Sequence, residues 1–140
     1  MTAKGFLRWA RGVDRRIDEA TERVERIRAR LEAGRMSSVT GMPRGGVQDW
    51  TATADRLIEL EKDVNARIRE MCRLKRLAQE AIDQVDEARL REVLELYYID
   101  GYTWEQVARR MDITERWALI LHGRALLRVR VPEEISDSSL

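Results

Sequence analysis

Few residues in this chain have the types and spacing that catalysis or metal binding requires. His122 is the only histidine and Cys72 the only cysteine, and no cysteine or carboxylate stands at ligand spacing around His122. The sequence holds no catalytic triad or nucleotide-binding motif, and its acidic residues are spread along helix surfaces. We interpret His122 as a packed or phosphate-facing residue and Cys72 as a packed apolar one. We therefore expect no enzyme, no metal and no cofactor.

The arginines near the C-terminus indicate a different chemistry, contact with nucleic acid. The whole chain is nearly neutral, with 26 Lys and Arg against 25 Asp and Glu, so bulk charge does not indicate such a partner. Between residues 107 and 130, however, six arginines stand against two acidic residues. These arginines are Arg109, Arg110, Arg116, Arg124, Arg128 and Arg130. Their local excess favours contact with phosphate groups.

The arginines lie in or next to a stretch, residues 90–128, that has the pattern of a helix-turn-helix. An apolar-periodic run ends at Gly101, because glycine accepts the left-handed backbone that closes a helix. Thr103 and Gln106 have the spacing of a capping box, which predicts a short helix over 104–111. A turn follows, and Thr114 is expected to cap a second helix that runs to about residue 129. A short helix, a turn and a longer helix form the unit that places its second helix in the DNA major groove.

The outer face of the second helix carries the candidate contacts. With Ala118 at the centre of the buried face, Arg116 falls on the opposite face and suits a bidentate contact to guanine. Arg124 suits a phosphate, while Glu115 can accept from cytosine or simply favour the helix dipole. The residues that we assign to DNA contact are Arg109, Arg110, Thr114, Glu115, Arg116, Trp117, Ile120 and Arg124.

The segment YYIDGYTWEQVARRMDITERW, followed by LHGRAL, resembles region 4 of bacterial primary sigma factors. With the opening MTAKGFL and the central LIELEKDVN, nearly the whole chain resembles a family of small phage and prophage sigma-like proteins of largely unassigned function. These are similar to late transcription regulators of the ArpU and RinA type. The resemblance implies a helix-turn-helix fold, double-stranded DNA as a partner, and action on late genes or together with host RNA polymerase.

Two positions depart from this family pattern. Where sigma region 4 and the phage proteins usually carry polar or basic residues, this chain has Trp117 and Ile120. Together with Leu127, they could contact thymine methyl groups or form a patch for a protein partner.

The first part of the chain predicts two long helices. Apolar residues from Phe6 to Leu31 alternate at spacings of four and three, which predicts one helix over about 3–33 that ends at Gly34. A Gly-, Ser- and Pro-containing loop is expected near 35–50, and a second helix from about 49 to 85. Asp86 is expected to cap the next helix. The two seams can pair within one chain or between chains, so a monomer, a homodimer and a higher oligomer all stay open.

The sequence thus predicts an all-α protein with a long antiparallel hairpin at 1–85, a helix-turn-helix at 86–130 and a disordered acidic tail at 131–140. The preferred function is a phage or prophage DNA-binding transcription regulator. The alternatives are a small terminase-like DNA-packaging subunit, which would form rings, and a protein-interaction module that docks RNA polymerase or another partner without touching DNA. No membrane span or signal peptide is visible, so we expect a cytoplasmic protein.

Overall fold

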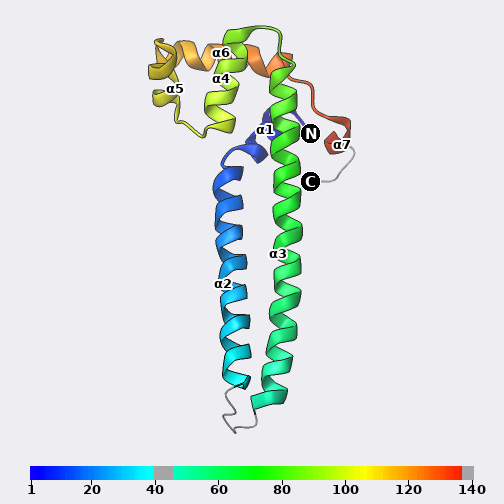
Figure 1. Ribbon diagram of the computed structural model, residues 1–140. Coiled ribbons are helices and arrows are strands. Elements are labelled where there is room, and N and C mark those ends of the chain that lie inside the picture. Colours follow the sequence, from blue (N-terminus) through cyan, green and yellow to red (C-terminus); the bar gives the residue numbers. More distant parts are fainter. Residues whose placement is uncertain (40–45, 137–140) are drawn as a thin grey trace. The chain divides into compact units, whose positions relative to one another are not determined.

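The computed structural model describes residues 1–39 and 46–136 (Figure 1). Over these residues the chain is helical and forms no strand, which confirms the all-α prediction. In order, the elements are α1 (Ala3–Ala10), α2 (Val13–Val39), α3 (Gly46–Asp83), α4 (Ala88–Leu94), the π-helical turn η1 (Glu95–Ile99), α5 (Trp104–Met111), α6 (Glu115–Arg128) and α7 (Glu133–Ser136). None of these helices combines the length and apolar content that crossing a bilayer needs.

The chain divides into two compact units. The hairpin unit comprises residues 14–70, and the head unit comprises residues 1–13 together with 71–140. The hairpin was expected to comprise residues 1–85. The observed hairpin unit is shorter at both ends, since the whole of α1 and the last part of α3 belong to the head unit.

The hairpin unit packs α2 against the first part of α3 in antiparallel directions (Figure 1). Its core contains four buried side chains, Val24 and Ile27 from α2 and Leu57 and Val64 from α3. Ala20, Leu31, Trp50, Leu60 and Ile68 are partly buried against them. The heptad-like seams therefore pair within one chain, as one of the sequence interpretations expected.

The helix expected over 3–33 begins at Ala3 as predicted, but the single helix is wrong in its middle and at its C-terminal end. The helix is interrupted at Arg11 and Gly12, where Gly12 takes a φ of +77°, so that α1 and α2 are separate helices. At the other end, α2 continues through Gly34 to Val39. Gly34 permits a close approach instead of a helix end, because a Cβ placed there would lie 1.9 Å from the Trp50 ring.

The loop expected near 35–50 is shorter than predicted. Residues 35–39 continue α2, and α3 already begins at Gly46. The remaining part of the expected loop, residues 40–45, lies outside the described residues.

The head unit is built around a core that the N-terminus helps to form. Phe6 and Leu7 of α1 are fully buried, and they share one cluster with Ile82 of α3, Leu94 of α4 and Ala118 of α6. The N-terminal helix is therefore part of the domain that carries the helix-turn-helix. Cys72, which we expected to be packed, is exposed on α3. The position before α4 is taken by Glu87, not Asp86, and it makes no side-chain cap hydrogen bond.

The acidic tail was expected to be disordered from residue 131, and for its first part this was wrong. Glu133–Ser136 form the short helix α7, and Ile135 is buried in the core of the head unit. Pro132 begins this turn, since its carbonyl accepts from the Ile135 N–H at 3.1 Å. Residues 137–140 lie outside the described residues.

Candidate nucleic-acid interface

The first helix of the helix-turn-helix begins as its sequence predicts. Gly101 has a φ of +76° and closes the preceding helical segment. The Thr103 hydroxyl accepts from the Gln106 N–H at 3.3 Å, and the Gln106 side chain accepts from the Thr103 N–H at 3.0 Å. Both halves of the capping box are therefore present and fix the start of α5.

The turn between α5 and α6 rests on one left-handed residue. Asp112 has a φ of +56°, which is uncommon outside glycine but tolerated by aspartate. The next N–H, that of Ile113, donates to the Ala108 carbonyl at 3.0 Å and so satisfies the end of α5. Thr114 then caps α6, since its hydroxyl accepts from the Trp117 N–H at 3.1 Å. This confirms the predicted cap.

The predicted two faces of α6 are both present. Ala118, Leu121, His122 and Ala125 are buried, so one face anchors the helix to the core of the head unit. The opposite face is exposed and carries Arg116, Ile120, Gly123 and Leu127. A helix held along one side, with an arginine near its N-terminus on the other, has the arrangement that a major-groove reader requires.

All eight residues assigned to DNA contact from the sequence are exposed. Their local partners differ. Arg109 pairs with Glu105 at 3.0 Å, and the Arg110 guanidinium lies 4.3 Å from the centre of the Tyr102 ring. Arg124 lies 5.3 Å from the centre of the Trp117 ring. Arg116 has no ion pair within the part of the chain that the structure describes. Its guanidinium is therefore available to an external partner.

Apolar side chains also lie exposed on α6. Trp117 and Ile120 are each 38% exposed, and Leu127 is 86% exposed. Leu119, which the sequence did not single out, is 48% exposed. A helical projection centred on Ala118 places Leu119 at the edge of the buried face, so its exposure could have been predicted from the sequence. The outer face of α6 thus combines arginines with apolar groups.

His122 is a packed residue, which was one of its two predicted roles. Its Nε2 lies 2.6 Å from the Tyr98 hydroxyl, and the Trp104 and Tyr97 rings lie beside it, with centroids 4.6 and 5.8 Å away. Burial lowers the pKa of His122 from 6.5 to about 4, and the charge of Lys4 adds to this effect. Burial raises the pKa of Tyr98 to about 12. Both groups are therefore neutral at neutral pH, and the imidazole tautomer decides which of them donates the hydrogen bond between them.

Arg11 is a positioning residue that the sequence did not reveal. One guanidinium nitrogen donates to the Tyr97 carbonyl and to the Tyr102 carbonyl, the second at 3.1 Å. The same guanidinium lies 3.8 Å from the centre of the Tyr97 ring, which stacks on Trp104 at the start of α5. Arg11 thus holds the segment between η1 and α5 in place. The two carbonyls are 86 and 91 residues away, so no local pattern could have signalled the contact.

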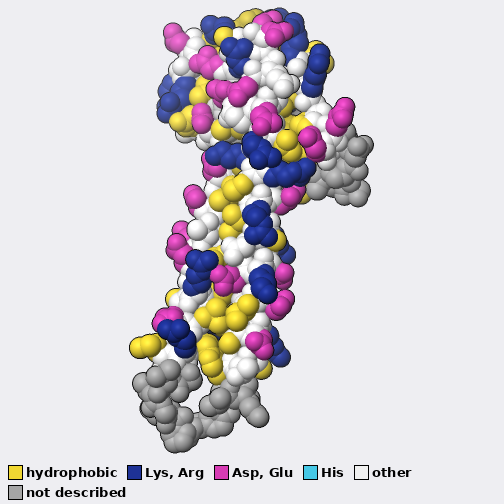
Figure 2. Space-filling view, turned by 45° about the vertical axis from the view of Figure 1, so that its right-hand side comes forward, with side chains coloured by type: hydrophobic (Ala, Val, Ile, Leu, Met, Phe, Trp, Pro, Cys, Tyr) yellow, Lys and Arg dark blue, Asp and Glu magenta, His cyan; other side chains and the backbone are white. Residues whose placement is uncertain are grey.

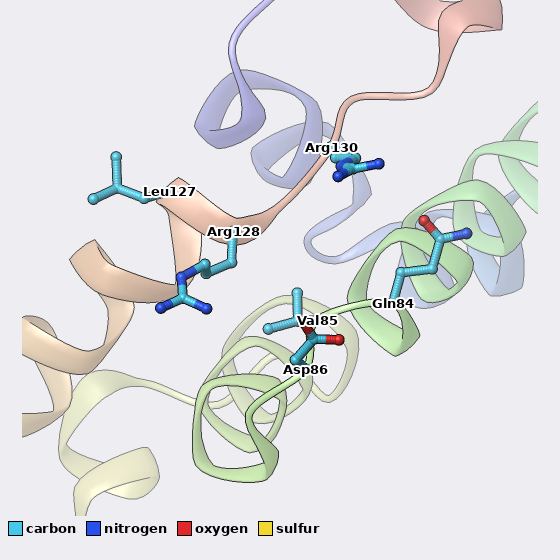
Figure 3. Close-up of a pocket in the computed structure, with 6 residues that line it drawn as sticks. All are labelled: Gln84, Val85, Asp86, Leu127, Arg128 and Arg130. Atoms are coloured by element: carbon cyan, nitrogen blue, oxygen red, sulfur yellow. The ribbon is translucent and has the colours of Figure 1, made fainter.

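A pocket of about 370 Å³ lies where the end of α6 meets the segment between α3 and α4 (Figure 3). Gln84, Val85, Asp86, Leu127, Arg128 and Arg130 line it. Arg128 pairs with Glu87 at 3.5 Å, so this arginine is directed to the protein's own carboxylate. The mixed charges do not form an anion site, and over the described residues no group of His, Cys, Asp and Glu could hold a metal ion.

These features define the class of the head unit, a helix-turn-helix domain with an exposed second helix. Residues 81–131 match the family model of sigma-70 region 4. This segment spans the end of α3 through α6, and it is a sigma region 4-like domain, as the sequence resemblance implied. Neither the curated proteins nor the solved structures gave a match to this chain.

Proposed function

We propose that this protein is a DNA-binding transcription regulator that reads the major groove of double-stranded DNA with α6. Arg116, near the N-terminus of this helix, makes a bidentate contact to a guanine edge. Thr114 and Glu115 lie at the same end and touch the neighbouring backbone or base edges. The observation that carries this proposal is the division of α6 into a buried anchoring face and an exposed face that presents an unpaired arginine.

Phosphate contacts come from the flanks of the helix-turn-helix. Arg109 and Arg110 end α5, where their side chains are exposed, and Arg124 extends from α6 two turns beyond Arg116. The weak local partners of these arginines do not prevent DNA contact, since an exposed i,i+4 ion pair contributes only about 0.3–0.5 kcal/mol. Trp117 and Ile120 contact thymine methyl groups between the arginines.

The cellular setting is a phage or prophage, where the regulator acts on late genes or with host RNA polymerase. The sigma region 4-like domain supports a polymerase partner, and the resemblance of the opening and central motifs to small phage proteins supports the setting. The protein works by binding and not by catalysis.

The test is equilibrium binding to a fluorescent 30-base-pair duplex of mixed sequence at two salt concentrations. We expect affinity to fall steeply with salt, and Arg116→Ala and Arg124→Ala each to weaken binding. Arg67→Ala, on an exposed position of the hairpin, is the matched control and should bind as the unchanged protein does. If the α6 variants keep both the affinity and the salt slope, α6 is not the DNA-contacting helix.

The exposed apolar residues of α6 favour a second candidate, a protein-docking role without DNA contact. Trp117, Leu119, Ile120 and Leu127 would then bind a partner such as RNA polymerase. Trp117→Ala would separate the two functions. Loss of polymerase capture with DNA affinity unchanged supports docking, whereas loss of DNA affinity supports the preferred function.

A further inference from the structure

The outer face of α6 carries an exposed apolar side chain, Ile120, between two arginines. With Ala118 at the centre of the buried face, Arg116 and Ile120 lie next to each other on the opposite face, four residues apart. Trp117 and Arg124 lie on the other side of Ile120, and the Arg124 guanidinium is 5.3 Å from the centre of the Trp117 ring. Ile120 is 38% exposed, so its side chain meets solvent between these charges.

The surface next to Ile120 is open. Gly123 follows Ile120 on the same row of the helix and brings no side chain. A Cβ placed on Gly123 would stand in open space, with no side chain beyond its chain neighbours within 4 Å. A ligand from outside can therefore approach Ile120 from this side.

The charges on this face favour nucleic acid as that ligand. Over residues 1–39 and 46–136, neither Arg116 nor Arg124 forms an ion pair. An apolar protein surface laid on Ile120 would bury guanidinium groups without partners, which costs free energy. In the DNA major groove, guanine edges and phosphates accept from guanidinium groups, and methyl groups on the bases offer apolar contact.

The hairpin unit, by contrast, carries balanced charge. Residues 14–70 contain twelve Lys and Arg and twelve Asp and Glu. Figure 2 shows side chains of both signs along the visible face of the hairpin. Such a balance gives no net attraction for phosphates. We therefore expect the contacts that choose a DNA sequence to lie on α6.

The spacing of Arg116 and Ile120 fits neighbouring base pairs. Four residues of α-helix advance about 6 Å along the axis, and one base-pair step advances about 3.4 Å. With Arg116 at a guanine edge, Ile120 lies within about two base pairs of that guanine. The apolar group that the bases present in the major groove is the methyl group at C5 of thymine.

We propose that Ile120, flanked by Trp117, recognises the C5-methyl group of a pyrimidine within two base pairs of the guanine at Arg116. This specificity rests on the proposed function, since it needs α6 in the major groove. Thymine carries the methyl group in unmodified DNA, and 5-methylcytosine carries the same group at the same position. Because Ile120 contacts the methyl group and not a hydrogen-bonding edge, methylation of a cytosine at this position strengthens binding.

The test compares duplexes that differ in this methyl group alone. The unchanged protein first enriches a duplex from a random pool, and the duplex is then rebuilt with deoxyuridine in place of each thymine in turn. Deoxyuridine pairs as thymine does and lacks only the methyl group. At the thymine near the guanine, we expect the Kd to rise by roughly fourfold, the loss that corresponds to one buried methyl group. With cytosine and 5-methylcytosine compared at the same position, the methylated duplex should bind more tightly by a similar factor.

A pair of variants assigns the contact to Ile120. Ile120→Ala should bind the thymine and deoxyuridine duplexes equally while the salt dependence stays, because the arginines are kept. Leu119→Ala is the matched control. Leu119 is 48% exposed at the edge of the buried face, and its variant should keep the difference between the two duplexes.

The outcomes separate this inference from the function on which it rests. If no duplex binds at low salt, the proposed function is overturned and the methyl contact with it. Salt-dependent binding with equal affinity for the thymine and deoxyuridine duplexes would overturn the methyl contact alone. An enriched motif without thymine within two base pairs of a guanine would do the same. A full difference between the duplexes in Ile120→Ala would overturn the role of this residue.

Discussion

The buried pair of Tyr98 and His122 makes the stability of the protein depend on pH in a defined window. In the folded protein the pKa of His122 is about 4, whereas an unfolded histidine titrates near 6.5. When the pH lies between these values, His122 therefore binds a proton in the unfolded chain but not in the folded protein. The stability that a neutral His122 contributes is complete above about pH 6.5 and is lost as the pH falls toward 4.

The size of the effect follows from the two pKa values. The difference in proton binding lowers the free energy of unfolding by about 1.4 kcal/mol at pH 5.5 and by about 2.5 kcal/mol at pH 4.5, relative to neutral pH. Against a total stability of about 5–15 kcal/mol, this is a large fraction. Carboxylates also begin to take up protons at the lower pH, so the histidine must be isolated by comparison with a variant.

The assay is urea unfolding followed by circular dichroism at pH 7.5, 6.5, 5.5 and 4.5. His122→Gln provides the comparison, because the glutamine amide can accept from or donate to the Tyr98 hydroxyl but does not titrate. The variant will be less stable at pH 7.5, yet it should lose about 2.5 kcal/mol less than the unchanged protein between pH 7.5 and 4.5. Equal losses in the two proteins would refute the assignment of a neutral, buried His122.

Four further substitutions test the packing and one helix cap. Gly34→Ala forces the Trp50 ring to move and should destabilise the protein by about 1–3 kcal/mol, measured by thermal unfolding. Gly123→Ala, with no atom within 4 Å of the added Cβ, should stabilise it by about 0.5–1 kcal/mol. A change in stability of the same sign in both variants would contradict the close approach of Trp50 to Gly34. Arg11→Met removes two charged hydrogen bonds and a ring contact, and should cost about 2 kcal/mol in urea unfolding; an unchanged midpoint would argue against its positioning role. Thr114→Ala removes the cap of α6 and should cost about 1 kcal/mol, and a loss below about 0.3 kcal/mol would show that the cap contributes little.

The helix-turn-helix was predictable because its signals are local. The Thr103 capping box and the Thr114 cap each depend on residues three apart, and both form as expected. The two faces of α6 follow from helical periodicity alone. Whether the exposed residues contact DNA stays a prediction, since this role depends on a partner and not on the chain's own packing.

The errors arose where the deciding contact is distant in sequence. Gly34 was expected to end a helix, because glycine commonly does so, but the ring of Trp50 from the opposing helix requires it inside α2. Arg11 donates hydrogen bonds to the carbonyls of Tyr97 and Tyr102, which lie 86 and 91 residues later in the sequence. Ile135 packs into a core whose other members all precede it in the sequence. Periodicity cannot reveal such contacts, since it records only the face on which a residue lies.

The central claim, that α6 reads DNA through Arg116, is tested most directly by selecting duplexes from a random pool with the unchanged protein and with Arg116→Ala. We expect the unchanged protein to enrich a motif with a guanine at one position. Arg116→Ala should lose the preference at that position alone, with a cost of about 1–3 kcal/mol in affinity for the selected sequence. Enrichment of the same motif by both proteins, or of no motif by the unchanged protein, would contradict it.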